Sequence, residues 1–368
     1  MWKSFVCPRS ELKLSTTLAC GQSFRWREKN PGEWIGVLAG RVWLLSQDDD
    51  QIYFKTFGNS IRQDKPLSNV GRKRQTKANL NTALSDKGVS SIPEDNVCTA
   101  AEKETLRDYF QLSVSLVELY NSWSKSDLNF HQTARNFDGI RMLRQDPVEN
   151  LFSFICSSNN HISRISQMVE RLCQTYGDKI IDVDGYSFHA FPSVKPLASD
   201  DVEQELRALG FGYRAKYINQ TAKHIMQYHD ENWLYSLRSL PYKETKTELM
   251  KLCGVGAKVA DCVCLMSLDK AEAVPVDTHV WQIAARDYMP KLKQAKSLTD
   301  KLYGEIGDHF RGLWGDYAGW AHSVLFTADL KQFKEEKSSE KLTEKKCQGK
   351  RKVESDSFLT RKGKKKVK

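Results

Sequence analysis

The sequence has no long hydrophobic run and no short disulfide framework. None of its apolar stretches approaches the roughly 18 to 20 residues that a helix needs to cross a bilayer, and residues 1–13 lack the apolar core of a secretory signal. Its nine cysteines are an odd number scattered over 368 residues, a pattern typical of free thiols in a reducing compartment. We therefore expect a protein that neither spans a membrane nor is secreted.

Net charge is also scarce over most of the chain. Of the 56 basic and 46 acidic residues, 15 and 6 lie in residues 331–368, which leaves 41 basic and 40 acidic residues in residues 1–330. Because residues 1–330 are nearly neutral overall, they do not attract nucleic acid through a general positive field. If it binds DNA, it must use backbone amides and a few placed side chains.

The pattern of apolar residues predicts an α+β fold that is mainly α-helical. Alternating segments at 23–27, 33–38, 41–45 and 51–55 predict strands of an antiparallel meander. After residue 102 the apolar residues recur with helical spacing. The length also exceeds what one core usually needs, so we expect two domains.

Composition sets the expected domain boundaries. We predict an N-terminal antiparallel sheet domain over residues 1–125, with a mobile insertion at 58–100 that is rich in Ser, Asn, Lys and Arg. A helical domain follows over residues 126–330. Residues 331–368 are charge-rich with almost no apolar residues, so we expect this basic tail to be disordered.

Two glycines in the helical part form a candidate phosphate-binding turn. One helical pattern ends before Cys253 and a second begins near Ala257, with Gly254 and Gly256 between them. Such a helix-hairpin-helix leaves amides at a helix start, where the positive end of the dipole can hold a phosphate. On the glycines alone, an ordinary turn between helices is the simpler interpretation.

A lysine and an aspartate near this hairpin indicate covalent chemistry. Lys258 lies just inside the second helix, where the helix dipole disfavours the ammonium and favours the nucleophilic amine. Asp277 follows an extended segment that contains Pro275 and precedes an apolar helix, so it is also a candidate N-cap. The alternatives are a solvated surface lysine and a purely structural cap.

Several motifs combine in one chain. They are CGQSFRW at 20–26, FSFICSSNN at 152–160, GFGYRAKY at 210–217, GVGAKVADC at 254–262, VDTH at 276–279 and YAGWA at 317–321. With them the chain resembles the helix-hairpin-helix Gly/Pro-Asp family of base-excision glycosylases, and specifically the eukaryotic 8-oxoguanine DNA glycosylases. The resemblance covers most of residues 1–330 but neither the insertion nor the tail.

The resemblance implies a bifunctional DNA glycosylase and lyase that excises 8-oxoguanine opposite cytosine from double-stranded DNA in base excision repair. The nucleotide would be flipped out of the duplex, and Lys258 would attack C1′ of its sugar, displace the base and form a Schiff base. Asp277 would stabilise positive charge on the sugar, and elimination of the 3′ phosphate would follow. Neither a metal nor another cofactor is implied, and we expect a monomer.

The resemblance also assigns the other site residues. The Gly21 carbonyl would accept the N7 proton that 8-oxoguanine has and guanine lacks, while Cys262 and Phe326 would lie against the two faces of the base. His322 and Asp329 complete the expected base pocket. The residues expected to contact DNA are Asn159, Arg164, Tyr213, Arg214, Gly254, Gly256 and His279.

Three residues depart from the family pattern. His322 replaces a glutamine, His161 an asparagine and Cys253 a proline. Because an imidazole has one donor and one acceptor, His322 can still contact the edge of the lesion, and the geometry and pH response are the properties in question.

Two other functions stay open. An endonuclease III-like glycosylase shares the hairpin, the lysine and the aspartate, but such enzymes usually hold an iron–sulfur cluster with four cysteines after the aspartate. Only Cys347 lies beyond Asp277, which excludes that cluster. A non-catalytic module that grips DNA phosphates would need neither Lys258 nor Asp277.

The basic clusters of the tail predict a location. They lie at 345–346, 350–352, 361–362 and 364–366, and they resemble nuclear localisation signals or non-specific DNA tethers. We expect the protein in the nucleus. A solubilising tail and additional import into mitochondria stay open as alternatives.

Overall fold

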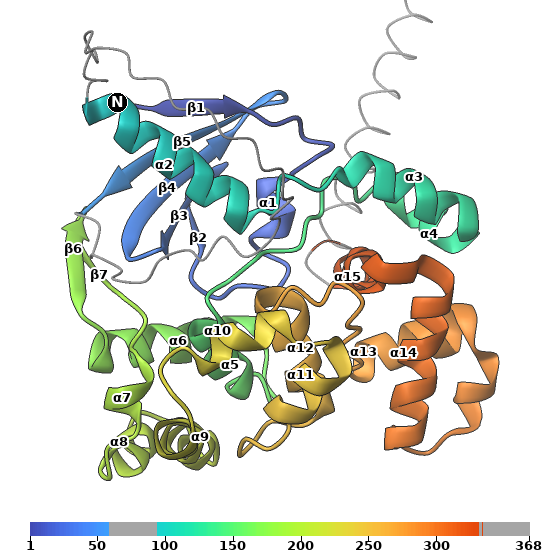
Figure 1. Ribbon diagram of the computed structural model, residues 1–368. Coiled ribbons are helices and arrows are strands. Elements are labelled where there is room, and N and C mark those ends of the chain that lie inside the picture. Colours follow the sequence, from blue (N-terminus) through green and yellow to red (C-terminus); the bar gives the residue numbers. More distant parts are fainter. Residues whose placement is uncertain (59–93, 331–332, 334–368) are drawn as a thin grey trace, which may run out of the picture.

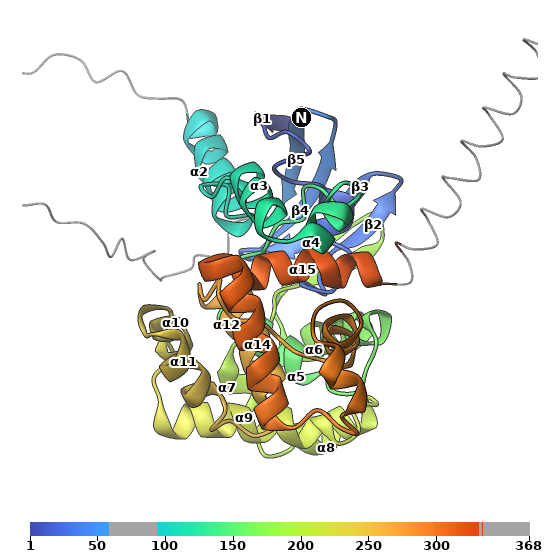
Figure 2. The same cartoon turned by 90° about the vertical axis from the view of Figure 1, so that its right-hand side faces the viewer.

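The computed structural model describes residues 1–58, 94–330 and 333, which form an antiparallel sheet beside a larger helical region (Figure 1). In the turned view, helix α15 (Ala318–Asp329) crosses between the sheet and the helices below it (Figure 2). The expected α+β, mainly helical fold is confirmed. None of the helices in these ranges has the length and apolar character of a membrane span, and the seven cysteines described are free thiols.

Five strands form the sheet in the order β1-β5-β4-β3-β2, and all neighbouring pairs are antiparallel. The four consecutive strands β2 to β5 make the predicted meander, whereas β1 is an edge strand that the sequence pattern did not predict. The strand predicted at 33–38 has the same bounds in the structure. The strands are β1 Lys3–Val6, β2 Arg27–Asn30, β3 Glu33–Leu38, β4 Arg41–Gln47 and β5 Gln51–Phe57.

The strand predicted at 23–27 is wrong, because β2 begins only at Arg27. The apolar alternation there has another cause. Phe24 packs in the core of the helical region, with its ring 5.6 Å from that of Phe154, whereas Trp26 packs in the core of the sheet. Alternate side chains of this segment therefore enter two different cores.

Both faces of the sheet are covered. Trp43 of β4 lies in the core shared with α2 (Glu94–Tyr109), while its neighbour Val42 lies in the opposite core with Phe188. A strand buried on both faces needs apolar residues at successive positions, which explains the sequence of β4. Phe188 belongs to a two-stranded antiparallel hairpin formed by β6 Lys179–Val183 and β7 Tyr186–His189.

Most buried apolar side chains of the helices form one continuous core. Sequence signals set the helix ends, as at α5: the Asp146 carboxylate accepts the N–H groups of Val148 and Glu149, and Pro147 takes the first helical position. The remaining helices are α1 Leu14–Thr17, α3 Leu116–Ser126, α4 Leu128–Ala134, α5 Pro147–Ile155, α6 Ile162–Tyr176, α7 Val194–Leu197, α8 Val202–Ala208, α9 Arg214–Tyr228, α10 Trp233–Ser236, η1 Leu237–Ser239, α11 Tyr242–Leu249, α12 Ala257–Ser267, α13 Thr278–Ile283, η2 Ala284–Tyr288, η3 Pro290–Gln294, α14 Asp300–Trp314 and η4 Gly315–Tyr317.

The insertion predicted at 58–100 is partly corrected. Helix α2 begins at Glu94, so the last seven residues of the predicted insertion are helical although their sequence has no apolar periodicity. Residues 59–93, and the tail apart from Phe333, lie outside the described residues. The boundary between residues 125 and 126 stays a prediction, since Trp123 already packs in the helical core.

Candidate active site

The predicted hairpin joins α11 to α12, and its two glycines have different surroundings. Gly254 has φ +79°, and a Cβ atom there would lie 2.5 Å from the ring of Tyr217. Glycine alone satisfies both conditions. Gly256 is the N-cap of α12, and a Cβ atom there would meet nothing within 4 Å. Because glycine has no side chain to cap them, the first amides of α12 are available to a ligand.

Lys258 and Asp277 come from two different helices and line the same cavity. Lys258 lies in the first turn of α12, with Nζ 3.4 Å from the Ser157 hydroxyl and 5.1 Å from the centre of the Phe154 ring. Asp277 is the N-cap of α13, where Oδ1 accepts the backbone N–H of Val280 at 2.9 Å. The predicted cap is confirmed, and it holds the carboxylate in place beside the cavity.

The cavity has a volume of about 60 Å³. Ligand pockets usually measure roughly 300–1,000 Å³, so a purine enters only when the walls move. Six predicted site residues line the cavity, namely Gly21, Lys258, Cys262, Asp277, His322 and Phe326. The other lining residues are Cys20, Gln22, Phe154, Met266, Pro275, Val280, Ser323 and Thr327.

The N-terminal part supplies one wall of the cavity through residues 20–22. Gly21 has φ +84°, and a Cβ atom there would lie 2.9 Å from Cδ1 of Ile162, so glycine is required for both conformation and space. The Gln22 side chain fixes this turn. Its Nε2 donates to the Arg141 carbonyl at 2.9 Å, and its Oε1 accepts the N–H of Leu143 at 3.0 Å.

His322 is the most unusual side chain of the cavity. It is only 7% exposed, and neither ring nitrogen has a hydrogen-bond partner among the described residues. Burial lowers the pKa of His322 to about 4, so the ring is neutral at pH 7. The Asp277 charge and the Gly319 backbone act in the opposite direction. Six described residues have buried polar atoms without a partner, and His322 is the one of them that lines the cavity, which makes it a candidate for contacting a ligand.

Two further walls are apolar at neutral pH. Burial raises the pKa of the Cys262 thiol to about 11, although the nearby Lys258 lowers it, so the thiol stays protonated. The half-buried Phe326 ring lies 6.3 Å from the ring of His322 and 6.3 Å from that of His279. These surfaces suit the faces of a planar base.

Three residues predicted to contact DNA meet at the turn around residue 158. Tyr213 is 44% exposed, and its hydroxyl donates to the Ser158 carbonyl at 3.0 Å. Arg214 is buried, with Nε donating to the Ser158 carbonyl at 3.1 Å and Nη2 to the Asn159 carbonyl at 3.0 Å. Arg214 thus holds the turn, in which Asn159 has φ +46°, while Tyr213 faces outward.

The other predicted contacts lie in different places. His279 and Arg164 are exposed in the first turns of α13 and α6. His161, a departure from the family pattern, accepts the backbone N–H of Arg164 at 3.4 Å through Nδ1. Asp329 is not among the described residues that line the cavity. It pairs instead with Arg286, with Oδ1 and Nη1 3.2 Å apart.

Two polar residues near the site were given no role from the sequence. Ser157 lies beside the Lys258 amine, and Asp261 is fully buried one turn after Lys258 on α12. A carboxylate between apolar residues of a helix implies a buried partner, because burying an unpaired charge is very costly. That signal was present in the sequence for Asp261. Ser157 carried no comparable signal.

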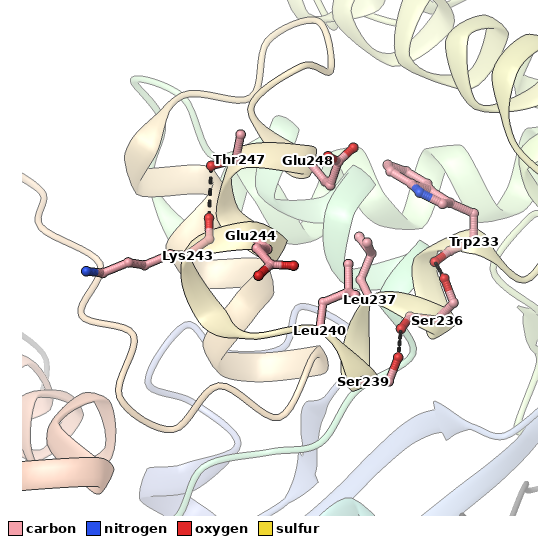
Figure 3. A pocket seen from close by; sticks show the side chains of 9 residues that line it. All are labelled: Trp233, Ser236, Leu237, Ser239, Leu240, Lys243, Glu244, Thr247 and Glu248. Carbon is pink, nitrogen blue, oxygen red and sulfur yellow. Dashed lines mark hydrogen bonds between the residues drawn. The ribbon is translucent and has the colours of Figure 1, made fainter.

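A larger hollow of about 500 Å³ lies beside α10, η1 and α11 (Figure 3). Its hydroxyls bond to backbone carbonyls of their own turns: Ser236 to Trp233 at 2.7 Å, Ser239 to Ser236 at 2.7 Å, and Thr247 to Lys243 at 2.9 Å. Of the buried polar atoms without a partner in the described residues, none belongs to this hollow. The candidate site is therefore the smaller cavity.

Family models match both halves of the chain. The N-terminal domain of 8-oxoguanine DNA glycosylase matches residues 4–151, and the HhH-GPD superfamily of base excision DNA repair proteins matches residues 152–307. The chain is 37% identical over 331 residues to the N-glycosylase/DNA lyase OGG1 of Arabidopsis thaliana, which covers 89% of this chain and 80% of the relative. It is 37% identical over 347 residues to the N-glycosylase/DNA lyase of Saccharomyces cerevisiae, covering 88% and 84%.

Solved structures show the same fold. The 8-oxoguanine glycosylase/lyase of Clostridium acetobutylicum in its apo-form has a TM-score of 0.68 and 27% identity, covering 89% of this chain and 98% of that one. Its complex with double-stranded DNA containing cytosine opposite 8-oxoguanine has a TM-score of 0.67 and 26% identity, covering 89% and 96%. With these likenesses over both halves, the chain belongs to the 8-oxoguanine DNA glycosylase/lyase family of the HhH-GPD superfamily.

Proposed function

We propose that this protein removes 8-oxoguanine paired with cytosine from double-stranded DNA and then cleaves the strand at the resulting site, as a step of base excision repair. One observation carries the proposal. Lys258 and Asp277 line one cavity together with four residues expected to contact the base. The relatives named N-glycosylase/DNA lyase support the same pair of activities.

The two catalytic residues divide the chemistry. The Lys258 amine attacks C1′ of the sugar, the bond from C1′ to N9 breaks, and the base leaves with the electron pair and takes up a proton. Opening of the sugar at O4′ then gives a Schiff base between C1′ and Lys258. Loss of a C2′ proton breaks the bond from C3′ to O3′ and cuts the strand. The Asp277 carboxylate stabilises the positive charge that develops on the sugar.

In the proposed reaction the lesion is flipped into the small cavity, whose walls must open to admit it. A stacked base is out of reach of Lys258, so the nucleotide must leave the duplex. The half-buried Phe326 and the Cys262 thiol would then lie on the two faces of the base. Tyr213, the exposed aromatic residue at the Ser158 turn, would occupy the space that the base leaves.

Discrimination against guanine would rest on the Gly21 carbonyl. Guanine presents an acceptor at N7, whereas 8-oxoguanine has a proton there. A fixed carbonyl pairs with the lesion and meets a repelling lone pair on guanine. The Gln22 hydrogen bonds hold the turn firmly enough for such a test. The neutral His322 would contact the Watson–Crick edge with one donor and one acceptor.

The rest of the DNA would be held by few groups. The uncapped first amides of α12 and the exposed His279 would bind phosphates, and Asn159, Arg164 and Arg214 would approach the cytosine. We also propose that the protein acts as a monomer. Its basic tail would direct it to the nucleus, so a chain ending near residue 330 should no longer accumulate there.

Borohydride trapping tests the proposed reaction. The protein is incubated with a duplex carrying one 8-oxoguanine opposite cytosine, beside an undamaged duplex and beside Lys258→Gln. We expect a covalent band with the lesion only, because borohydride reduces the Schiff base to a stable amine, and no band with the variant. Base release without a band would indicate hydrolysis assisted by Asp277. Neither release nor a band would refute the proposal.

A further inference from the structure

A buried carboxylate links the helices around the site. Asp261 of α12 is 0% exposed and accepts three hydrogen bonds. Oδ1 accepts from the Tyr242 hydroxyl at 2.7 Å, while Oδ2 accepts from Lys246 Nζ at 2.7 Å and from the Tyr303 hydroxyl at 2.6 Å. One ammonium and two phenols thus satisfy the charge, and they join α11, α12 and α14.

The Tyr303 hydroxyl has a second partner, the backbone N–H of Val276 at 3.2 Å. A phenol has a single proton. Because Tyr303 donates it to Asp261, the hydroxyl can only accept from Val276, and the direction of both bonds is fixed. Burial, together with Asp261, raises the pKa of Tyr303, so the phenol keeps its proton.

The bridge connects the two catalytic residues. Asp261 lies one helical turn after Lys258 on α12, and Val276 directly precedes Asp277. We propose that Tyr303 is a positioning residue, which sets the distance between the amine and the carboxylate by tying the Val276 amide to α12. The inference rests on the proposed function. Misplacement by about 1 Å can reduce a rate about 100-fold, so a single bond at this point matters.

Tyr242 provides a matched control. It donates a hydrogen bond of nearly the same length to the same carboxylate, 2.7 Å against 2.6 Å. Within the described residues, however, its hydroxyl has no hydrogen bond to the segment before Asp277. Tyr242→Phe therefore weakens the Asp261 cluster without freeing Val276. Tyr303→Phe does both and keeps the ring, which lies 4.7 Å from Lys246 Nζ.

The test compares single-turnover excision of 8-oxoguanine by the full-length wild type and both variants, with enzyme in excess. Thermal unfolding and binding to a duplex containing a tetrahydrofuran site are measured in parallel. We expect Tyr303→Phe to lower the rate roughly 10- to 100-fold with binding within two-fold, and Tyr242→Phe to lower the rate less than three-fold at a similar loss of Tm. Equal rate losses in both variants, or an unchanged rate in Tyr303→Phe, would overturn the proposal.

Two further measurements separate positioning from general weakening. In an Asp277→Asn background, Tyr303→Phe should slow the residual reaction less than two-fold, because both changes act on the same carboxylate. If the two substitutions instead lowered the rate by independent factors, Tyr303 would not act through Asp277. Hydrogen exchange should show faster exchange of the Val276 amide in Tyr303→Phe only. If the wild type itself does not excise the lesion, the proposed function fails, whereas an active wild type with equal variants rejects only the role of Tyr303.

Discussion

Arg141 and His322 are both buried polar side chains, yet their surroundings are opposite. Arg141 lies against the N-terminal part, where Nε donates to the Glu11 carbonyl at 2.7 Å, Nη1 to the Gln111 carbonyl at 2.6 Å and Nη2 to the Glu11 carboxylate at 2.8 Å. A further bond reaches the carbonyl of Val114. His322 has no partner for either nitrogen among the described residues. The Arg141 guanidinium thus holds the fold together, whereas the His322 ring leaves a donor and an acceptor unused beside the cavity.

Replacing Arg141 tests whether its hydrogen bonds hold the fold, and it should lower the free energy of unfolding more than any other change considered below. Arg141→Met removes the charged partner of the Glu11 carboxylate, which keeps only the backbone N–H groups of Leu116 and Val117, and it removes a donor from several carbonyls. We therefore expect the free energy of unfolding to fall by about 3–5 kcal/mol. Urea unfolding followed by tryptophan fluorescence measures this. Arg207→Met, which removes only an exposed pair with Glu203, should cost under about 0.5 kcal/mol. Similar losses of stability in Arg141→Met and Arg207→Met would show that the buried bonds of Arg141 do not hold the fold more than an exposed ion pair does.

The two hairpin glycines give a second contrast between a residue that the fold requires, Gly254, and one beside amides that are open to a ligand, Gly256. Gly254→Ala adds a Cβ atom 2.5 Å from the Tyr217 ring at a positive φ, so we expect a loss of about 2–3 kcal/mol in stability. Gly256→Ala points into open space and should cost under about 1 kcal/mol. Urea unfolding and DNA binding should be measured for both. The comparison fails if Gly256→Ala is the less stable of the two.

The pH dependence of the free energy of unfolding tests whether His322 is buried without a partner. The folded pKa of about 4 lies below the ordinary value of 6.5, so between these values the unfolded chain binds more protons. The contribution of the neutral His322 ring to the free energy of unfolding is therefore complete above pH 6.5 and is lost as the pH falls toward 4. The loss between pH 7 and pH 5 is about 2 kcal/mol. His322→Leu should lack this part of the slope. Parallel curves for the two proteins would show that His322 does not titrate in this way.

The sequence predicted most of the sheet because β3 and β4 follow turns and bury apolar side chains at regular positions. It failed at residues 23–26, where alternation reflects two separate cores instead of two faces of one sheet. It also placed the start of α2 too late, because residues 94–100 carry no apolar stripe. The first error concerns a segment whose side chains make contacts distant in the sequence.

The site shows a similar division. Motif residues such as Lys258, Cys262 and His322 were predicted to meet, and they line one cavity. The role that we propose for Tyr303 could not be read from the sequence, since it depends on a hydroxyl of α14 reaching an amide 27 residues earlier. Asp329 was expected in the pocket, but its ion pair with Arg286 depends on the path of η2, which the sequence pattern did not indicate.

The wall formed by residues 20–22 determines what either half of the chain can do alone. Lys258 and Asp277 belong to the helical region, whereas Gly21 comes from the N-terminal part and is anchored by Gln22 to residues 141–143. A helical fragment without that wall would expose its nucleophile to bulk water and would lack the carbonyl that we assign to recognition of the lesion. In the proposed reaction the nucleophile thus comes from the helical region, whereas the carbonyl that distinguishes the lesion at N7 comes from the N-terminal part, so the site depends on both.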